Sequence, residues 1–113
     1  MNTLKTVEDP TTPYNPTTGR NYSGGNPAEL VACGYDDLRW AGYGQWQKAG
    51  RQVMEGQKNT TLVRMVPAYD KKTGKPKLNK DGTPKLRKTS VRVFNWEQTE
   101  DKATADALRA LAA

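Results

Sequence analysis

The side chains that most often carry catalysis are scarce in this sequence. Its 113 residues include no His and one Cys, Cys33, which excludes imidazole-based triads, His-ligated metals, an internal disulfide and a Cys-rich zinc site. Adjacent acids such as Asp36–Asp37 and Glu100–Asp101 could in principle act as acid–base pairs or hold Mg²⁺. Their positions are typical of solvated loops and helix starts, so we expect no enzyme activity, no metal site and no cofactor. We predict that Cys33 is a small, buried apolar residue.

Anion binding is the chemistry that the charged residues favour. The chain carries 18 Lys and Arg against 12 Asp and Glu, a net charge of +6. Half of the basic residues lie within residues 70–92, which we call the basic arm: Lys71, Lys72, Lys75, Lys77, Lys80, Lys85, Arg87, Lys88 and Arg92. Only Asp70 and Asp81 oppose them there. Such a concentration of cations is typical of surfaces that neutralise phosphates, and a merely solvated charged loop is the alternative.

A short internal repeat lies within the basic arm. DKKTGKPKL at 70–78 is followed by NKDGTPKL at 79–86, and each copy has a Gly turn before Pro-Lys-Leu. Asp81-Gly82 is a strong signal for a tight turn, because Gly adopts positive φ without a steric penalty. Proline cannot donate to a strand ladder, so Pro76 and Pro84 belong at strand edges or starts. The repeat therefore predicts a protruding β-arm.

Two strands are predicted at the base of the basic arm. TTLVRMVPA at 60–68 is rich in β-branched residues, and KTSVRVFNW at 88–96 alternates in polarity. In the second strand the two valines fall on one face and Lys88 and Arg92 on the other. The pattern predicts an antiparallel pair with one apolar face and one basic face.

Two short helices are predicted before these strands. Asn26-Pro27-Ala28-Glu29 is typical of a helix start with Asn26 as its cap, and the helix would run to Cys33 and end at Gly34. A second helix is predicted over 43–49, ended by Gly50.

The last fifteen residues, TEDKATADALRALAA, predict a marginal Ala-rich helix that would use Ala105, Leu108 and Leu111 as its apolar stripe. No apolar run approaches the roughly 20 residues of a membrane span, and the N-terminus lacks the apolar core of a signal peptide. We therefore expect a soluble, intracellular protein.

The stretch NPTTGRNYSGGN at 15–26 precedes the first predicted helix. It contains three Gly, three Asn and one Pro, together with Arg20 and Tyr22. Such a composition is found both in disordered leaders and in ordered loops whose backbone approaches a ligand or a packed neighbour closely.

Three blocks of the sequence together resemble the N-terminal domain of ArdC-type antirestriction proteins, a domain also found in plasmid-transfer primases and phage-encoded proteins. The blocks are NPTTGRNYSGGN at 15–26, RWAGYGQWQKAGRQV at 39–53 and VFNWEQTE at 93–100. The resemblance covers roughly residues 13–100. It implies single-stranded DNA binding, associated with mobile elements that enter a new host. It also implies that 15–26 is an ordered loop.

The resemblance and the charge pattern together give the predicted contacts. Phosphates would be bound by Arg20, Arg39, Lys58, Arg64, Lys72, Arg87, Lys88 and Arg92. Bases would stack on one or more of Tyr14, Tyr22, Tyr43 and Trp46. Trp40 and Phe94 are assigned to the core. Packing within the domain stays an open alternative for Tyr22 and Trp46.

These observations predict a single small α+β domain, with two short N-terminal helices packed on an antiparallel sheet that carries the basic arm. Residues 1–12 would be a flexible tail, 13–100 the nucleic-acid-binding domain and 101–113 a short C-terminal helix or tail. The expected function is sequence-tolerant single-stranded DNA binding in the cytoplasm of a bacterial host, linked to antirestriction or to DNA transfer or replication. The alternatives are a module that grips an acidic host protein and a binder of double-stranded DNA or RNA.

Overall fold

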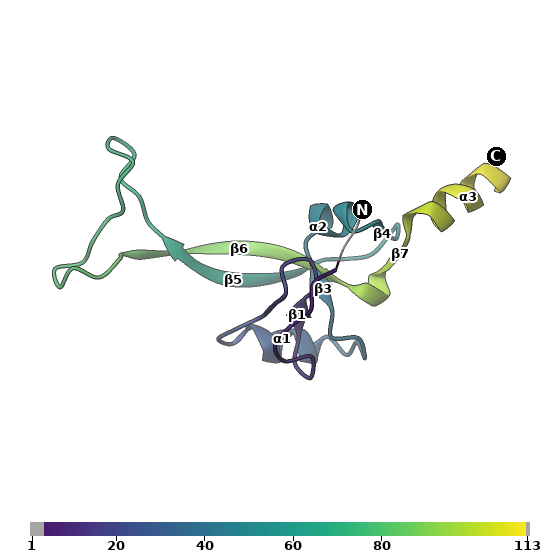
Figure 1. Cartoon of the computed structure of the whole chain (residues 1–113), viewed down its shortest axis with the longest axis horizontal. Coiled ribbons are helices and arrows are strands. Elements are labelled where there is room, and N and C mark those ends of the chain that lie inside the picture. The colour runs from purple at the N-terminus through teal and green to yellow at the C-terminus, as the bar shows by residue number, and fades with distance from the viewer. Residues whose placement is uncertain (1–3, 113) are drawn as a thin grey trace.

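The computed structural model describes residues 4–112 of an elongated molecule that measures 61 × 33 × 27 Å. Its elements are β1 (Tyr14–Asn15), β2 (Arg20–Asn21), α1 (Asn26–Ala32), β3 (Trp40–Ala41), α2 (Tyr43–Lys48), β4 (Arg51–Val53), β5 (Thr60–Pro67), β6 (Leu86–Asn95), the 3-10 turn η1 (Trp96–Gln98), β7 (Thr99–Asp101) and α3 (Lys102–Ala112). A central body contains α1 and α2; the β5–β6 hairpin extends from one side of it and α3 from the other (Figure 1). The predicted small α+β class with antiparallel strands is confirmed.

The strands pair in three small antiparallel sheets. The largest has the order β3-β6-β5, and the other two are the pairs β1-β2 and β4-β7. Strands β5 and β6 lie where the β-branched and alternating segments predicted them. The register opposes Leu62 to Val91 and Thr60 to Val93, so these four side chains share one face of the hairpin.

The core lies where the helices meet this sheet. One cluster joins Leu30 of α1 to Trp40, Leu62 and Val93. A second cluster joins Ala41, Trp46 and Phe94, with Ala49 packed against it. The predicted core positions of Trp40 and Phe94 are confirmed, since their relative exposures are 1% and 9%.

Helix α1 starts and ends close to the predicted positions. Its N-cap residue is Gly25 rather than Asn26, and the Asn26 side chain instead donates a 3.0 Å hydrogen bond from Nδ2 to the carbonyl of Val63 in β5. Gly34 ends the helix with a φ of 85°, a left-handed conformation that favours glycine. The Asn26 bond therefore ties the start of α1 to the hairpin.

The prediction that Cys33 is buried is wrong. Cys33 lies at the C-terminal end of α1 and its side chain is exposed, with Sγ 3.5 Å from the hydroxyl of Thr60. Helix α1 is only two turns long and Leu30 is its one buried residue, so Cys33, which follows its last turn, lies beside the start of β5 and outside the core.

The β5–β6 hairpin ends in residues 68–85, which we call the forked tip. Three hydrogen bonds close a ring at its base: Ala68 N to Lys85 O at 2.9 Å, Lys77 N to Ala68 O at 2.8 Å and Lys85 N to Lys77 O at 2.8 Å. Two small loops, residues 69–76 and 78–84, leave this ring and diverge (Figure 1). The two loops follow the two copies of the sequence repeat.

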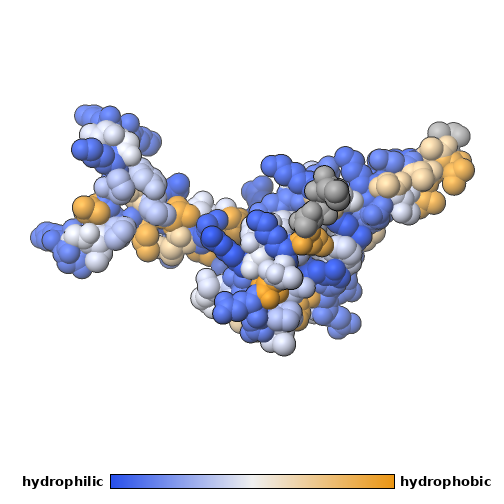
Figure 2. Space-filling view, viewed as in Figure 1, coloured by the Kyte–Doolittle hydropathy of each residue, from blue (hydrophilic) through white to orange (hydrophobic). Residues whose placement is uncertain are grey.

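Within residues 102–111 of helix α3, one position is buried. Ala105 is buried, but Leu108 and Leu111 are 58% and 83% exposed, so most of the predicted apolar stripe faces outward (Figure 2). Within residues 4–112, no helix combines the length and the apolar character that crossing a membrane requires.

The segment before β1 was predicted to be a flexible tail. Residues 1–3 of that segment lie outside the described residues. In the remainder, Lys5 N donates to the carbonyl of Pro16 at 2.7 Å, and the side chain of Asn21 donates to the carbonyl of Asp9 at 2.6 Å. The part from residue 4 onward therefore lies against the 15–26 loop.

Candidate nucleic-acid interface

The stretch NPTTGRNYSGGN forms an ordered loop around Asn15, which is only 8% exposed. Asn15 Oδ1 accepts hydrogen bonds from the backbone N and the hydroxyl of Thr17, at 2.9 and 2.6 Å. Asn15 Nδ2 donates to Oε1 of Gln45 at 2.9 Å, and the same oxygen accepts from Gly42 N at the start of α2. One amide side chain thus holds the loop, and a second joins the loop to a helix.

Glycine is required at the turn of this loop. Gly19 has a φ of 75°, and a Cβ at this position would lie 2.9 Å from the carbonyl oxygen of Thr6. The turn brings β2 back along β1, which places Arg20 and Tyr22 on the side of the loop that faces the hairpin. The expectation of an ordered loop is consistent with this geometry.

Tyr22 is fixed at the inner wall of the loop. Its hydroxyl donates to the carbonyl of Trp40 at 3.0 Å, and its ring packs against the first core cluster. Burial raises the pKa of Tyr22 well above its ordinary value, so the phenol stays neutral and keeps this bond. The packing role considered for Tyr22 is present, and the residue also lines a groove.

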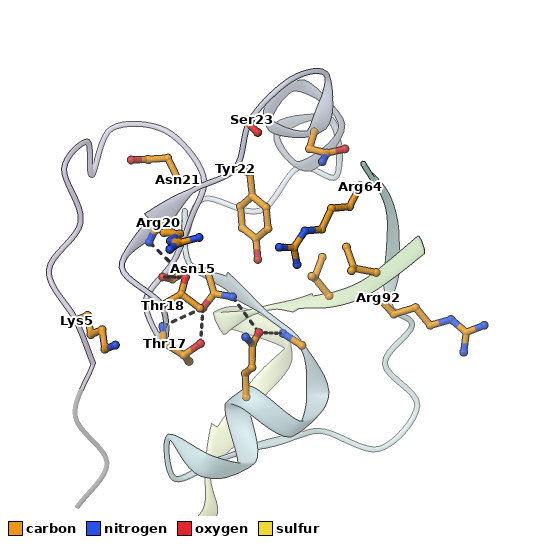
Figure 3. A pocket seen from close by; sticks show the side chains of 15 residues that line it. Lys5, Asn15, Thr17, Thr18, Arg20, Asn21, Tyr22, Ser23, Arg64 and Arg92 are labelled. Carbon is orange, nitrogen blue, oxygen red and sulfur yellow. Dashed lines mark hydrogen bonds between the residues drawn. The ribbon is translucent and has the colours of Figure 1, made fainter. Parts of the chain in front are cut away.

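This groove has a volume of about 730 Å³ and lies between the 15–26 loop and the β5–β6 hairpin (Figure 3). Cationic residues around it include Lys5, Arg20 and Arg64, and none of the described residues that line it is acidic. In the described part of the chain, ion pairs form at Arg39–Asp37 and Arg109–Asp106, so no carboxylate there neutralises the three cations. The groove is therefore a positively charged concavity with an aromatic wall.

Arg64 and Arg92 contribute to the groove in different ways. Arg64 opposes Thr89 in the strand register, on the same face as Leu62, and its side chain points toward Tyr22 (Figure 3). Arg92 opposes Thr61 on the other face, and its side chain points away from the groove (Figure 3). Only Arg64 places its guanidinium inside.

The predicted separation of the two valines of β6 from Lys88 and Arg92 is confirmed, but the hairpin as a whole does not have one apolar face and one basic face. By register, Arg64 and Arg87 lie on the face that carries Leu62 and Val93. The opposite face does carry Lys88 and Arg92, but it also carries two apolar residues of β5, Val63 and Met65, which are 55% and 49% exposed. Each face of the hairpin therefore mixes apolar and cationic side chains.

Trp46 cannot stack on a base, which corrects its inclusion among the predicted DNA contacts. Its relative exposure is 0%, and Nε1 donates to the carbonyl of Phe94 at 2.8 Å. Its ring meets the edge of Trp96 at a centroid distance of 5.7 Å. The alternative of a core position for Trp46 is confirmed.

Tyr14 and Tyr43 lie outside the groove. Tyr14 is half-buried in β1, where it bridges to Arg39. Tyr43 is 53% exposed on α2 and meets Phe94 edge-on at a centroid distance of 6.3 Å. Among the predicted stacking residues, Tyr22 alone belongs to the described lining of the groove.

Arg39 is held in an ion pair away from the groove. Its guanidinium donates to both carboxylate oxygens of Asp37, the shortest bond being 2.6 Å, and it lies 3.8 Å from the ring centroid of Trp96. Burial acts to raise the pKa of Asp37, but the hydrogen bonds and charge of Arg39 outweigh it and hold that pKa below its ordinary value. The partnered guanidinium fits a structural role better than the predicted phosphate contact.

The remaining predicted contacts are exposed but dispersed. Lys72 lies in the forked tip, Arg87 and Lys88 lie at the outer end of β6, and Lys58 lies in the turn before β5. None of these four residues belongs to the described lining of the groove. They therefore form an outer set of cations rather than one site with Arg20 and Arg64.

Most of the residues that line the groove were not among the predicted contacts, and three of them, Lys5, Asn15 and Gln45, matter most for its shape and charge. Lys5 precedes the blocks that resemble the family, and Asn15 and Gln45 lie within those blocks as amides with no charge to mark them. The amides shape the loop, and Lys5 adds a cation at its edge. Among residues 4–112, no three His, Cys, Asp or Glu side chains come together as metal ligands could.

Comparison with known proteins confirms the resemblance. The family model for the N-terminal domain of anti-restriction factor ArdC matches residues 2–106. Two Escherichia coli proteins, both named DNA primase TraC, are 39% identical over 101 residues and 36% identical over 100 residues, each match covering 78% of this chain. The matched stretches are 10% and 7% of the primases, so the chain corresponds to a small part of them.

Solved structures share the fold. The metal-free and Mn(II)-bound crystal structures of the antirestriction protein ArdC from the R388 plasmid match with TM-scores of 0.60 and 0.57, at 27% and 26% identity. Each match covers 80% of this chain and 32% or 35% of the ArdC chain. This chain therefore spans about a third of those ArdC structures.

Proposed function

The chain belongs to the family of N-terminal domains of the anti-restriction factor ArdC, and from that premise we propose that it binds single-stranded DNA with little sequence preference. The observation that carries the proposal is the groove beside the 15–26 loop, where Arg20 and Arg64 lie near Tyr22, Lys5 lies at the edge, and no described lining residue is acidic (Figure 3). We propose that the domain acts by binding, without a catalytic step of its own.

Each part of the groove has a task in this proposal. Arg20 and Arg64 bind phosphates on either side of Tyr22, and Lys5 adds attraction at the edge. A base that is free of a duplex stacks on the exposed part of the Tyr22 ring. Because phosphate contacts and stacking do not read base edges, binding tolerates any sequence.

The outer cations extend the positive field beyond the groove. Arg87 lies two residues from the partner of Arg64 in the register and so continues the groove face toward the forked tip. Three further cations hold their charges outside the groove: Lys88 and Arg92 on the opposite face of the hairpin, and Lys58 before β5. They raise the local concentration of an anionic strand without contacting it inside the groove. Their contribution is expected to weaken strongly with salt.

The relatives supply a biological context for this activity. ArdC is named as an antirestriction protein of a plasmid, and the TraC proteins are named as DNA primases. We propose that this chain also serves a mobile element, protecting or processing DNA that passes as a single strand into a bacterial host, and that it acts in the host cytoplasm.

A protein-binding module is the second candidate, and one observation favours it. Exposed apolar residues on the outer face of the hairpin, Val63, Met65 and Leu86, lie beside Lys88 and Arg92. Such a mixed surface could grip an acidic host protein. Variants of this face and of the groove separate the two candidates, because only groove variants should weaken DNA binding strongly.

The test is fluorescence anisotropy with a labelled oligomer of about 20 nucleotides and with its blunt duplex. We expect the single strand to bind more tightly, and Arg20→Gln with Arg64→Gln to weaken it for every sequence tried. Lys48→Gln with Lys102→Gln removes the same charge from exposed helix positions outside the groove and should have little effect. Equal loss in both double variants would contradict a groove site.

A further inference from the structure

The forked tip carries a set of cations that the groove does not use. Six lysines are exposed there: Lys71, Lys72, Lys75, Lys77, Lys80 and Lys85. The two carboxylates of the forked tip form hydrogen bonds within their own loops. Asp70 accepts a hydrogen bond from Lys72 N at 2.8 Å, and Asp81 accepts hydrogen bonds from the backbone N and the hydroxyl of Thr83. Among the described residues, no ion pair joins these carboxylates to the lysines.

The fork places Lys71, Lys72 and Lys75 on one of its two loops, or prongs, and Lys80 on the other, while Lys77 and Lys85 lie in the ring at its base. The first loop is closed by a bridge between Tyr69 and Pro76, and the second by a bridge between Leu78 and Pro84. Each loop turns at a glycine with positive φ, Gly74 or Gly82. The ends of both loops are hydrophilic, and hydrophobic residues lie nearer the base of the fork (Figure 2). Cations therefore project from both prongs.

Cations dominate this surface. Residues 68–85 contain six lysines but one aromatic residue, Tyr69, which lies at the base of the first loop rather than at its end, so the ends of the fork offer phosphate contacts and no ring on which a base could stack. A duplex hides its bases and presents two rows of phosphates along its grooves. Lysines on two diverging loops allow contacts with both rows, and a two-stranded ribbon is narrow enough for the major groove.

The forked tip also lies close enough to the groove for one DNA molecule to contact both. Strand residues rise about 3.3 Å each, so the four residues from Arg64 to Ala68 span roughly 13 Å. A DNA strand in a duplex rises about 3.4 Å per nucleotide, so this distance corresponds to roughly four nucleotides. One DNA molecule could therefore reach both surfaces.

We propose that the forked tip binds the phosphates of duplex DNA while the groove holds an adjoining single strand, so that the chain recognises a duplex with a single-stranded overhang. The junction part of this inference rests on the proposed function of the groove. The duplex part rests on the forked tip alone.

Three labelled probes test the proposal by anisotropy: a single strand of about 10 nucleotides, a blunt duplex of about 16 base pairs, and that duplex carrying the single strand as an overhang. We expect the overhang probe to bind at least about tenfold more tightly than the single strand, an effect of two linked contacts. Lys72→Gln with Lys80→Gln, one change on each prong, should remove most of that advantage. Affinity for the short single strand should stay within about twofold, because these lysines lie outside the groove.

Salt titration and a control variant test whether the prong lysines contact duplex phosphates directly. For the overhang probe, the slope of log K against log salt should fall by about 0.9 for each lost duplex phosphate contact. Lys48→Gln with Lys102→Gln is the charge-matched control and should keep the overhang advantage.

An overhang probe that binds no more tightly than the single strand overturns the proposal, as does equal loss of single-strand and overhang affinity in the prong variant. Failure of the single strand to bind at all contradicts the groove and removes the junction. The duplex part then requires Lys72→Gln with Lys80→Gln to weaken binding of the blunt probe, and unchanged binding overturns it as well.

Discussion

Arg64 and Arg92 lie on neighbouring strands of one hairpin, yet their side chains leave it on opposite faces. The register pairs Arg64 with Thr89 and Arg92 with Thr61, and successive residues of a strand alternate between faces. Arg64 consequently points into the groove toward Tyr22, while Arg92 points away (Figure 3). Both arginines are exposed, yet they should differ in their effect on binding.

Replacement of each arginine by Gln tests that difference. Arg64→Gln should weaken single-strand binding for every sequence, because a phosphate contact inside the groove is lost. Arg92→Gln should weaken it less, since its guanidinium acts from outside. Both are surface changes, so the free energy of unfolding should move by no more than about 0.5 kcal/mol. Anisotropy measures the change in affinity and urea denaturation measures the change in stability. A larger loss of affinity for Arg92→Gln than for Arg64→Gln would mean that DNA binds to the outer face of the hairpin, which contradicts the groove model.

Tyr22 has two roles in this account: its hydroxyl stabilises the fold through a hydrogen bond, and its ring provides a surface on which a base can stack. Tyr22→Phe keeps the ring and loses the hydrogen bond to Trp40 O, so stability should fall by about 1 kcal/mol while affinity persists. Tyr22→Ala removes the stacking surface and should cost about 1–3 kcal/mol of binding free energy. The comparison uses the affinity of the folded fraction, measured well below the denaturation midpoint. Equal affinities in the two variants would exclude stacking on Tyr22.

Trp46 should matter for stability and not for contact with DNA. Trp46→Phe leaves the carbonyl of Phe94 buried without its 2.8 Å partner and should destabilise the domain by about 1–3 kcal/mol. Thermal denaturation reports this loss, and anisotropy on the folded fraction should show unchanged affinity. A variant with intact stability and lost binding would restore Trp46 to the DNA-contacting surface.

The Asp37–Arg39 pair makes stability depend on acid pH. The pKa of Asp37 is lower in the folded chain than its ordinary value, so the unfolded chain takes up a proton first as the pH falls. The stabilisation is complete above the ordinary value of about 3.9 and disappears as the pH falls through the lowered folded pKa. Denaturation midpoints measured between neutral and acid pH should show this decline, and Asp37→Asn should flatten that part of the profile. An unchanged profile in Asp37→Asn would mean that other carboxylates cause the acid sensitivity.

Periodicity and turn residues allowed much of this fold to be predicted. The alternation of KTSVRVFNW located β6, and the Gly turns of the two repeat copies anticipated the two loops of the forked tip. The pattern of TTLVRMVPA gave β5 but not the orientation of Arg64, because apolar residues occur on both sides of that strand. Its orientation follows from the register with β6, which a single strand's sequence does not encode.

The groove itself could not be predicted from local patterns. It forms because the 15–26 loop folds back toward residues far along the chain, held by the Asn15–Gln45 bond over 30 residues and the Asn26–Val63 bond over 37 residues. Trp46 was likewise ambiguous, since an aromatic residue at helical spacing serves a core or a stacking surface equally well. Only the packing of α2 on β6 decides between these roles.

The most direct test of a single strand bound in the groove is amide chemical-shift mapping by NMR, with the protein titrated by an oligothymidine of about 10 nucleotides. The groove model predicts that the largest shifts fall on residues 15–26 and on Arg64 and Val91, with smaller shifts at Val63 and Lys88 on the outer face. Shifts concentrated on the outer face, with the 15–26 loop unaffected, would contradict it.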